Sequence, residues 1–296
     1  MTRIYMAGCG GMLGQAFFEV FGDGNELRCT DIDVNEPWLS YMDFRDLEQY
    51  RADVASYGPD LLFHLGAHTD LEYCETHPDD AYLTNTVSVE NACYIAQELG
   101  IPLLYIGTAG IFDGTKLSYD DWDTPNPLGV YARTKFLGER IVQERLDRYY
   151  ICRAGWMMGG GPRKDKKFVN KIMMQIRRGA RELFVVNDKL GTPTYTYDFA
   201  QNVLVLLQTG FWGLYNMACA GATSRLDVAR EVVAILGMEE TIRIVEVSSE
   251  HFQNEYFAQR PPSERLTNAK LRLRGLDAMR PWQTALREYL EKEFSR

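Results

Sequence analysis

The chain begins with short apolar runs separated by longer amphipathic ones. Runs that are apolar throughout are typical of strands buried on both faces, and we expect five, at residues 3–8, 26–32, 60–67, 102–108 and 149–156. The amphipathic runs between them predict helices at residues 12–21, 46–57, 79–99 and 131–146. Strands that alternate with helices in this way form a parallel sheet with helices on both faces.

The second half of the chain has a different pattern, which begins after Trp156 with the chain-breaking segment Gly159-Gly160-Gly161-Pro162. Here we expect helices near residues 168–178 and 197–207, and strands near 183–186 and 213–218. The prediction is a doubly wound α/β domain of residues 1–156, to which segments near 183–218 return. A smaller, discontinuous lobe follows, made mostly of residues 157–296.

Composition narrows the class of protein. The 296 residues are 46% hydrophobic, enough for one large or two fused domains. The net charge of −9 gives no support to nonspecific nucleic-acid binding, which needs a basic face, and leaves room for a local basic pocket that binds an anionic substrate. The start of the chain lacks a signal-peptide pattern, and no apolar run is long enough to span a bilayer. The six cysteines have no metal-ligand spacing, so we expect reduced core thiols, no metal and a cytoplasmic location.

A glycine-rich loop, Gly8 to Gly14, directly follows the first strand and opens the first helix. Glycines permit a tight turn and let backbone N–H groups approach a pyrophosphate, and the helix N-terminus adds partial positive charge. The spacing of Gly8, Gly11 and Gly14 differs by one residue from the usual GxGxxG. The alternative is a purely structural turn, but the position between strand and helix favours a dinucleotide.

An acidic residue supports the same interpretation. Asp31 ends the second strand twenty residues after Gly11, where a carboxylate can bind the hydroxyls of the adenosine ribose. That carboxylate would repel a 2′-phosphate, so NAD is favoured, with NADP as the alternative. The alternative to ribose binding is that Asp31 merely begins the loop after the second strand. Asp43 and Phe44, after the presumed second strand, are candidates to contact the adenine.

Tyr131 and Lys135 carry the strongest chemical signal. They are four residues apart on a predicted helix and therefore share a face. A free phenol has a pKa of about 10, and a neighbouring ammonium group lowers it, so Tyr131 is expected to exchange a proton with a substrate oxygen. Thr108 ends the preceding strand at the edge of the sheet where ligands of such folds bind. The three residues predict a reduction site.

With these motifs in place, the chain resembles the extended short-chain dehydrogenase/reductases and, more narrowly, the dTDP-4-dehydrorhamnose reductase (RmlD-like) family. The likeness rests on the glycine loop, the Tyr131 to Glu139 segment, and five further segments: Leu65 to Asp70, Ile106 to Gly114, Arg153 to Trp156, Asn187 to Thr194, and Arg260 to Leu266. The resemblance implies a Rossmann-type fold with a substrate lobe.

The resemblance also implies an activity: NAD(P)H-dependent reduction of the 4-keto group of a nucleotide-linked 6-deoxy sugar. Tyr131 would supply the proton, Thr108 would polarise the ketone, and Lys135 would lower the tyrosine pKa and bind the nicotinamide ribose. The implied cofactor contacts are Gly8, Gly11, Met12, Leu13, Gly14, Asp31, Asp43, Phe44, Leu65, Gly66, Ala67, Tyr131 and Lys135.

The implied substrate contacts are His68, Thr108, Trp156 and Arg260, and a homodimer is the family-level expectation. Trp156 would lie against the sugar and Arg260 would bind the phosphates as a planar bidentate donor. Core packing is the alternative for Trp156, and a surface turn is the alternative for Arg260. The basic segment of residues 163–167 is expected to be a solvated loop.

The chain departs from the family pattern after the fifth strand. It has Gly107-Thr108-Ala109-Gly110 where the family usually carries Ser-Thr-Asp-Tyr, so two side chains placed to touch the sugar are missing. This weakens any assignment of the sugar. It leaves two alternatives open: a nucleotide-sugar 4-epimerase with tightly bound NAD, and a non-catalytic subunit that binds the cofactor.

Overall fold

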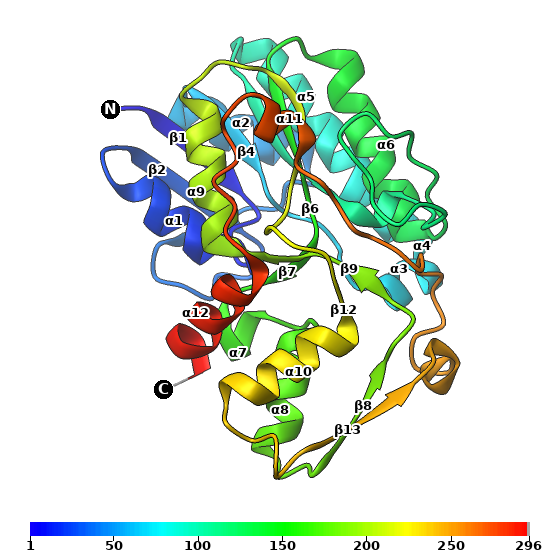
Figure 1. Cartoon of the computed structure of the whole chain (residues 1–296). Helices are drawn as coiled ribbons and strands as arrows, with labels where there is room; N and C mark the ends of the chain where they lie inside the picture. The colour runs from blue at the N-terminus through cyan, green and yellow to red at the C-terminus, as the bar shows by residue number, and fades with distance from the viewer. Residues whose placement is uncertain (295–296) are drawn as a thin grey trace.

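A computed structural model of the protein describes residues 1–294. Its centre is a sheet of seven parallel strands in the order β11-β6-β5-β4-β1-β2-β3 (Figure 1). The strands are β1 (Arg3–Ala7), β2 (Glu26–Asp31), β3 (Leu39–Tyr41), β4 (Leu61–His64), β5 (Leu103–Thr108), β6 (Tyr149–Ala154) and β11 (Gly213–Met217). Strand order reverses between β1 and β4, which places a ligand crevice at the carboxyl ends of these strands.

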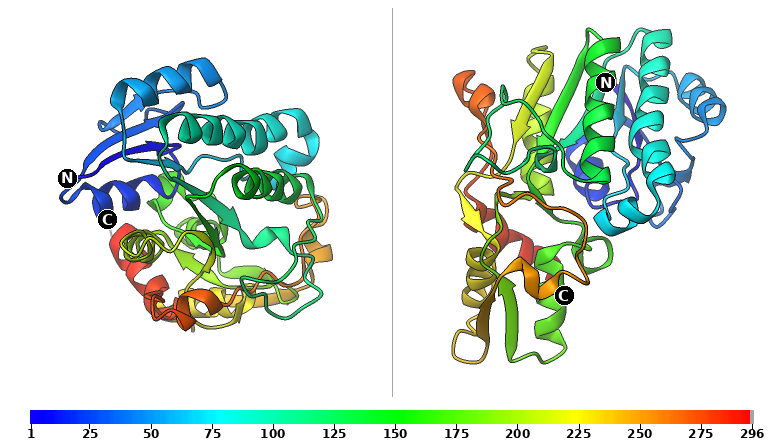
Figure 2. Two further views of the ribbon diagram at one scale, coloured as in Figure 1. Left: turned by 90° about the horizontal axis from the view of Figure 1, so that it is seen from above. Right: turned by 90° about the vertical axis from the view of Figure 1, so that its right-hand side faces the viewer.

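Helices cover both faces of the sheet, as the view from above shows (Figure 2). One face carries α1 (Gly14–Gly22) and α9 (Thr196–Leu207), whose Phe17 and Phe199 pack into one core with Phe63 of β4. The other face carries α2 (Leu47–Tyr57), α5 (Ser88–Leu99) and α6 (Val130–Arg145) over a second core. The Rossmann-type fold expected from the sequence is therefore confirmed.

The second lobe lies beyond the carboxyl edge of the sheet (Figure 1). Its helices are α7 (Gly161–Lys164), α8 (Phe168–Arg177), α10 (Arg225–Ile235) and α12 (Trp282–Phe294), and α11 (Ala269–Leu273) packs near β11. Its strands form three pairs: β7 (Trp156–Met158) with β10 (Pro193–Tyr195), β9 (Leu190–Gly191) with β12 (Thr223–Ser224), and β8 (Glu182–Val186) with β13 (Arg243–Val247). The core under α1 and α9 continues into this lobe through Ile172, Val232 and Leu286.

Several boundaries differ from the expectation. The short strand β3 was not foreseen, because three residues give too little periodicity. The strand expected at 149–156 ends at Ala154, and Trp156 pairs with β10 instead. Gly155 allows this change of partner, because a Cβ there would lie 2.2 Å from the Thr192 carbonyl oxygen. The strand expected near 183–186 is β8, which pairs within the lobe, whereas residues 213–217 join the sheet as expected.

The helix expected at 79–99 forms in three connected parts. It consists of α4 (Pro78–Tyr82), a π-helical turn (Leu83–Val87) and α5, and it is preceded by α3 (Leu71–Thr76). Among residues 1–294, no helix is long and apolar enough to cross a membrane. All six cysteines are buried free thiols.

The glycine loop gives a direct test of the fold. Gly8 has φ +87°, and a Cβ on it would lie 2.2 Å from the backbone N of Gly66. We expect Gly8→Ala to lower the free energy of unfolding by about 3 kcal/mol or more in urea titrations, because strain and clash add. Gly24→Ala is the matched control: φ is +76° there, nothing lies within 4 Å, and the expected cost is about 1 kcal/mol. Equal costs at both positions would contradict the close approach.

Candidate active site

The glycine loop is pinned between β1, β2 and α1. The backbone N–H groups of Gly8 and Cys9 both donate to the Thr30 carbonyl, at 2.8 and 3.1 Å. Gly14 begins α1 against the Cys9 carbonyl, to which a Cβ would come within 1.7 Å. These close approaches explain the glycines, and they aim the helix N-terminus at the crevice, as pyrophosphate binding requires.

Asp31 contacts the glycine loop. Its carboxylate accepts hydrogen bonds from the backbone N of Gly10, at 2.8 Å, and of Asp33, at 2.9 Å. Burial raises the pKa of Asp31, while these hydrogen bonds act in the opposite direction. The side chain therefore braces the loop at the end of β2, which is also where a ribose would approach.

The other expected adenine and nicotinamide contacts gather around Gly66. A Cβ on Gly66 would meet the ring of Phe44 at 2.3 Å, so this glycine lets the segment after β4 lie between Phe44 and Gly8. Leu65 extends the sheet by donating its backbone N–H to Ala7. Asp43 is engaged by Arg45 through hydrogen bonds of 2.7 to 3.1 Å, which lower its pKa.

The π-helical turn positions the loop that follows Gly66. It carries the buried Asn85, whose side chain accepts from the backbone N of His68 and donates to the His68 carbonyl and to Thr134 on α6. Such turns often occur at functional sites. The His68 imidazole lies 2.8 Å from a carboxylate oxygen of Asp80 on α4. The backbone and the side chain of His68 are thus both held by hydrogen-bond or charge partners.

Thr108 and Tyr131 come together as the sequence predicts. Thr108 ends β5 and Tyr131 lies in the first turn of α6. The two side chains meet beside Gly110, where a Cβ would lie 3.5 Å from the Thr108 hydroxyl and 3.8 Å from Cε1 of the Tyr131 ring. The expected effect of Lys135 on the tyrosine differs, however. Burial raises the pKa of Tyr131 to about 12, and only Thr108 lowers it. Loss of solvation of the phenolate outweighs any nearby ammonium, so Tyr131 is a protonated phenol at neutral pH.

Lys135 is buried on the same face of α6. Its Nζ lies 4.2 Å from the centre of the Tyr105 ring, a cation–π contact, and the side chain is 4% exposed. Burial lowers the pKa of Lys135 to about 7, while Glu139 acts in the opposite direction. The structure therefore holds a strongly desolvated amine beneath the crevice.

A buried ion pair that the sequence reasoning did not single out anchors α6. Arg153 of β6 and Glu139 of α6 are 3% and 2% exposed, and Arg153 Nε donates to Glu139 at 2.9 Å. A Cβ on Gly107 would lie 2.9 Å from the Arg153 side chain, which explains the glycine before Thr108. The only sign of this pair in the sequence was that Arg153 and Glu139 both lie in segments that carry the family resemblance.

Trp156 lies half-buried at the junction of the two lobes. Its ring packs against the backbone of Gly191, where a Cβ would come within 2.1 Å, and the Arg225 guanidinium lies 4.0 Å from the ring centre. Its indole Nε1 donates to Glu264 at 2.7 Å. The sequence reasoning singled out neither Arg225 nor Glu264 individually, because they lie 69 and 108 residues from Trp156.

Arg260 is engaged by an acidic residue. It donates to both carboxylate oxygens of Glu72 on α3, at 2.7 and 2.8 Å, and to the Ala258 carbonyl at 2.9 Å. The segment around it covers Tyr131, where a hollow of only about 20 Å³ is lined by Glu75, Gly110, Tyr131, Pro261 and their neighbours. The sequence analysis expected Arg260 either to bind phosphates or to lie in a surface turn. Neither expectation includes this ion pair with Glu72.

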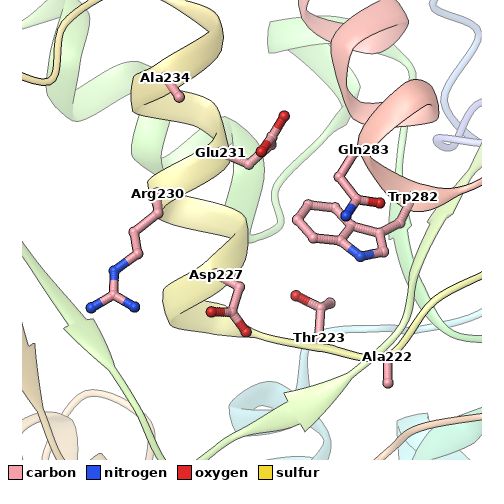
Figure 3. A pocket seen from close by; sticks show the side chains of 8 residues that line it. All are labelled: Ala222, Thr223, Asp227, Arg230, Glu231, Ala234, Trp282 and Gln283. Carbon is pink, nitrogen blue, oxygen red and sulfur yellow. The ribbon is translucent and has the colours of Figure 1, made fainter.

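The basic segment after the glycines is less solvated than expected. Asp165 is buried, Lys164 pairs with Glu36, and Lys167 donates to Thr69 in the loop after β4. The segment is therefore a bridge between the lobes, because its lysines find partners on the sheet side. A separate hollow lies between α10 and α12, lined by Ala222, Thr223, Asp227, Arg230, Glu231, Ala234, Trp282 and Gln283 (Figure 3). It includes none of the predicted site residues.

The family model described as the RmlD substrate binding domain matches residues 1–294. This chain belongs to that family. It is 28% identical over 296 residues to the spore coat polysaccharide biosynthesis protein SpsK of Bacillus subtilis, covering 100% of this chain and 99% of SpsK. It is 29% identical over 294 residues to the dTDP-4-dehydrorhamnose reductase of Mycobacterium tuberculosis, covering 96% and 91% of the two chains.

A solved structure is similar over almost the whole chain. The dTDP-4-dehydrorhamnose reductase of Bacillus anthracis, determined in complex with NADP, superposes with a TM-score of 0.89 at 26% identity and covers 98% of this chain and 99% of its own. The resemblance stated from the motifs is thus confirmed for the family and the fold.

Lys135 should reduce the stability of the protein. Its pKa is about 7 when folded and 10.5 as a model value, so between these pH values the unfolded chain binds more protons and stability rises with pH. We expect Lys135→Met to raise the free energy of unfolding by about 2–4 kcal/mol near pH 6, an advantage that shrinks toward pH 10. Urea titrations across this range measure it. A lower stability of the variant at pH 6, or a difference independent of pH, would contradict the desolvated amine.

Proposed function

We propose that this chain reduces the 4-keto group of a nucleotide-linked 6-deoxy sugar, with NAD(P)H as the hydride donor. The observation that carries the proposal is that Thr108 and Tyr131 meet beside Gly110 at the carboxyl edge of the sheet. Relatives in the same family are named dTDP-4-dehydrorhamnose reductase and dTDP-4-keto-6-deoxy-D-glucose reductase, which supports this reaction class.

The residues of the crevice fit a nicotinamide dinucleotide, which supplies the hydride when it is bound. The loop from Gly8 to Gly14, with Met12 and Leu13 at the start of α1, would hold the pyrophosphate, since its four glycines carry no Cβ that would block a close approach of the backbone. Asp31 would bind the adenosine ribose, Phe44 would border the adenine, and Leu65 to Ala67 would line the nicotinamide side. We favour NAD because of Asp31; the NADP complex of the Bacillus anthracis relative supports NADP as the alternative.

Tyr131 is the proton donor of the proposed reaction. Its raised pKa keeps the phenol protonated at neutral pH, so it can give a proton to the oxygen that gains negative charge as the ketone is reduced. Thr108 donates its hydroxyl to the same oxygen and polarises the carbonyl. Lys135 lies one helical turn away, and its amine would bind the nicotinamide ribose and restore the proton.

The second lobe, mostly residues 157–296, would bind the sugar nucleotide. His68 and Trp156 would contact the sugar, and Arg260 would bind the phosphates. Because Arg260 is paired with Glu72, phosphate binding must replace that carboxylate, and the segment around Arg260 must move for a sugar to enter. We also propose a cytoplasmic location, to which the reduced cysteines are suited, and a homodimer as in the initial family-level expectation.

Cofactor consumption tests the reaction directly. We expect one NADH or NADPH to be oxidised for each 4-keto-6-deoxy sugar nucleotide reduced, measured by absorbance at the nicotinamide band together with chromatography of the product. Interconversion of 4-hydroxy epimers without net consumption would instead identify a 4-epimerase. Cofactor binding with no turnover of dTDP-, UDP- or GDP-linked substrates would identify a non-catalytic subunit.

Tyr131→Phe tests the assigned proton donor. The substitution removes one hydroxyl and leaves the ring, so the variant should keep its cofactor dissociation constant and lose about 100-fold or more in kcat. Fluorescence titration with NADH and steady-state kinetics measure the two quantities. Near-normal kcat in the variant would refute the role of Tyr131.

A further inference from the structure

Glu264 lies on a segment whose backbone is held from two sides. Its backbone N–H donates to the Leu190 carbonyl at 2.8 Å, and Leu190 in turn donates to the Pro262 carbonyl at 2.9 Å. On the other side, the Arg265 carbonyl accepts from the backbone N of Tyr119 at 2.8 Å. The Cα of Glu264 is therefore placed by main-chain bonds, independently of what its side chain contacts.

The carboxylate of Glu264 reaches the catalytic residues. A Cβ built on Gly110 would lie 3.4 Å from Glu264 Oε1, 3.5 Å from the Thr108 hydroxyl and 3.8 Å from Cε1 of the Tyr131 ring. These three side chains thus converge on one point, which the absence of a side chain at Gly110 leaves free. Burial raises the pKa of Tyr131, and the charge of Glu264 is among the lesser causes that raise it further.

Only one of the two carboxylate oxygens is used. Oε2 accepts the indole N–H of Trp156 at 2.7 Å, and no donor from residues 1–294 lies on Oε1. Trp156 is itself packed against other groups: its ring lies against Gly191, and the Arg225 guanidinium lies over the ring and also contacts Phe168. A carboxylate anchored through one oxygen presents the other as a preorganised acceptor.

We propose that Glu264 binds the sugar, with Oε1 accepting a hydrogen bond from the hydroxyl on C3, the carbon next to the carbonyl that is reduced. This inference rests on the proposed reductase function. It assigns a specificity-determining residue to the second lobe, opposite Gly110.

The chemistry of the substrate selects the C3 hydroxyl. Thr108 and Tyr131 bind the oxygen on C4, so the group nearest to it must belong to C3 or C5. In a 6-deoxy hexose C5 carries a methyl group and the ring oxygen, neither of which donates a hydrogen bond, whereas C3 carries a hydroxyl. A carboxylate accepts from that hydroxyl and repels phosphate, which is consistent with the diphosphate lying toward Arg260.

Paired substrates test the assignment. The kcat/KM of the full-length enzyme is measured for a 4-keto-6-deoxy sugar nucleotide and for its 3-deoxy analogue, in the unaltered protein and in Glu264→Ala. In the unaltered protein we expect the 3-deoxy analogue to be about 10- to 100-fold poorer, as for loss of a hydrogen bond to a charged group. In Glu264→Ala this preference should fall to about 2-fold or less, because the partner of the hydroxyl is gone.

Two further variants separate sugar binding from a structural role. Trp156→Phe keeps a ring but removes the N–H that anchors Oε2, so the preference for the 3-hydroxy substrate should fall in part, mainly through KM. Glu246→Gln is the matched control: it removes a negative charge from an exposed ion pair with Arg230 in the same lobe and should leave the preference unchanged. Thermal unfolding of each variant checks that it is folded.

The outcomes are distinguishable. If Glu264→Ala slows both substrates equally, Glu264 only holds Trp156 in place and the proposal is overturned, while turnover by the unaltered protein still supports the reductase function. If the unaltered protein turns over neither substrate, the reductase function fails. Calorimetry then measures the affinity of the protein for the 4-hydroxy sugar nucleotide and for its 3-deoxy analogue, which tests Glu264 independently of turnover. If the unaltered protein prefers the 3-hydroxy ligand and Glu264→Ala abolishes this preference, Glu264 binds the sugar. If the unaltered protein binds both ligands with equal affinity, the proposal is overturned.

Discussion

The buried ion pair of Arg153 and Glu139 is the constraint on which the arrangement of the active site depends. Two buried charges destabilise the fold unless they stay paired. If α6 slid or rotated on β6, the pair would separate and leave each charge buried without a partner. Tyr131, Lys135 and Glu139 follow one another at four-residue intervals and lie along one face of α6. The ion pair that anchors Glu139 therefore also sets the direction in which the tyrosine and the lysine point.

The same burial sets the protonation states of the site. A weakly polar environment disfavours the charged form of every group, so the pKa of Tyr131 rises and that of Lys135 falls. The phenol consequently holds the proton that a reduction requires. Near neutral pH the buried lysine lowers the stability of the protein, so its presence fits the role proposed for it in the chemistry better than a role in packing.

Sequence reasoning predicted most of the fold but only part of the site. The strands β1, β2, β4 and β5 and the helix α6 have strong local periodicity, and Thr108, Tyr131 and Gly8 follow from their places relative to those elements. Local patterns carried no information about pairs formed across the chain, such as Arg260 with Glu72 or Trp156 with Glu264. The direction of the Tyr131 pKa shift was missed because it depends on burial, which spacing alone does not reveal.

The contacts of Glu264 favour a specificity-determining residue in the second lobe rather than on the edge of the sheet. The resemblance leads one to expect polar side chains directly after Thr108, on the rigid edge of the sheet, yet the chain has Ala109 and Gly110 there. A side chain on the sheet edge would hold its position whatever the second lobe did. Glu264 instead belongs to the lobe, and its bond to Trp156 joins segments 108 residues apart. Recognition of the sugar in the proposed reaction thus depends on the packing of the lobe against the sheet, because the acceptor opposite Gly110 comes from the lobe.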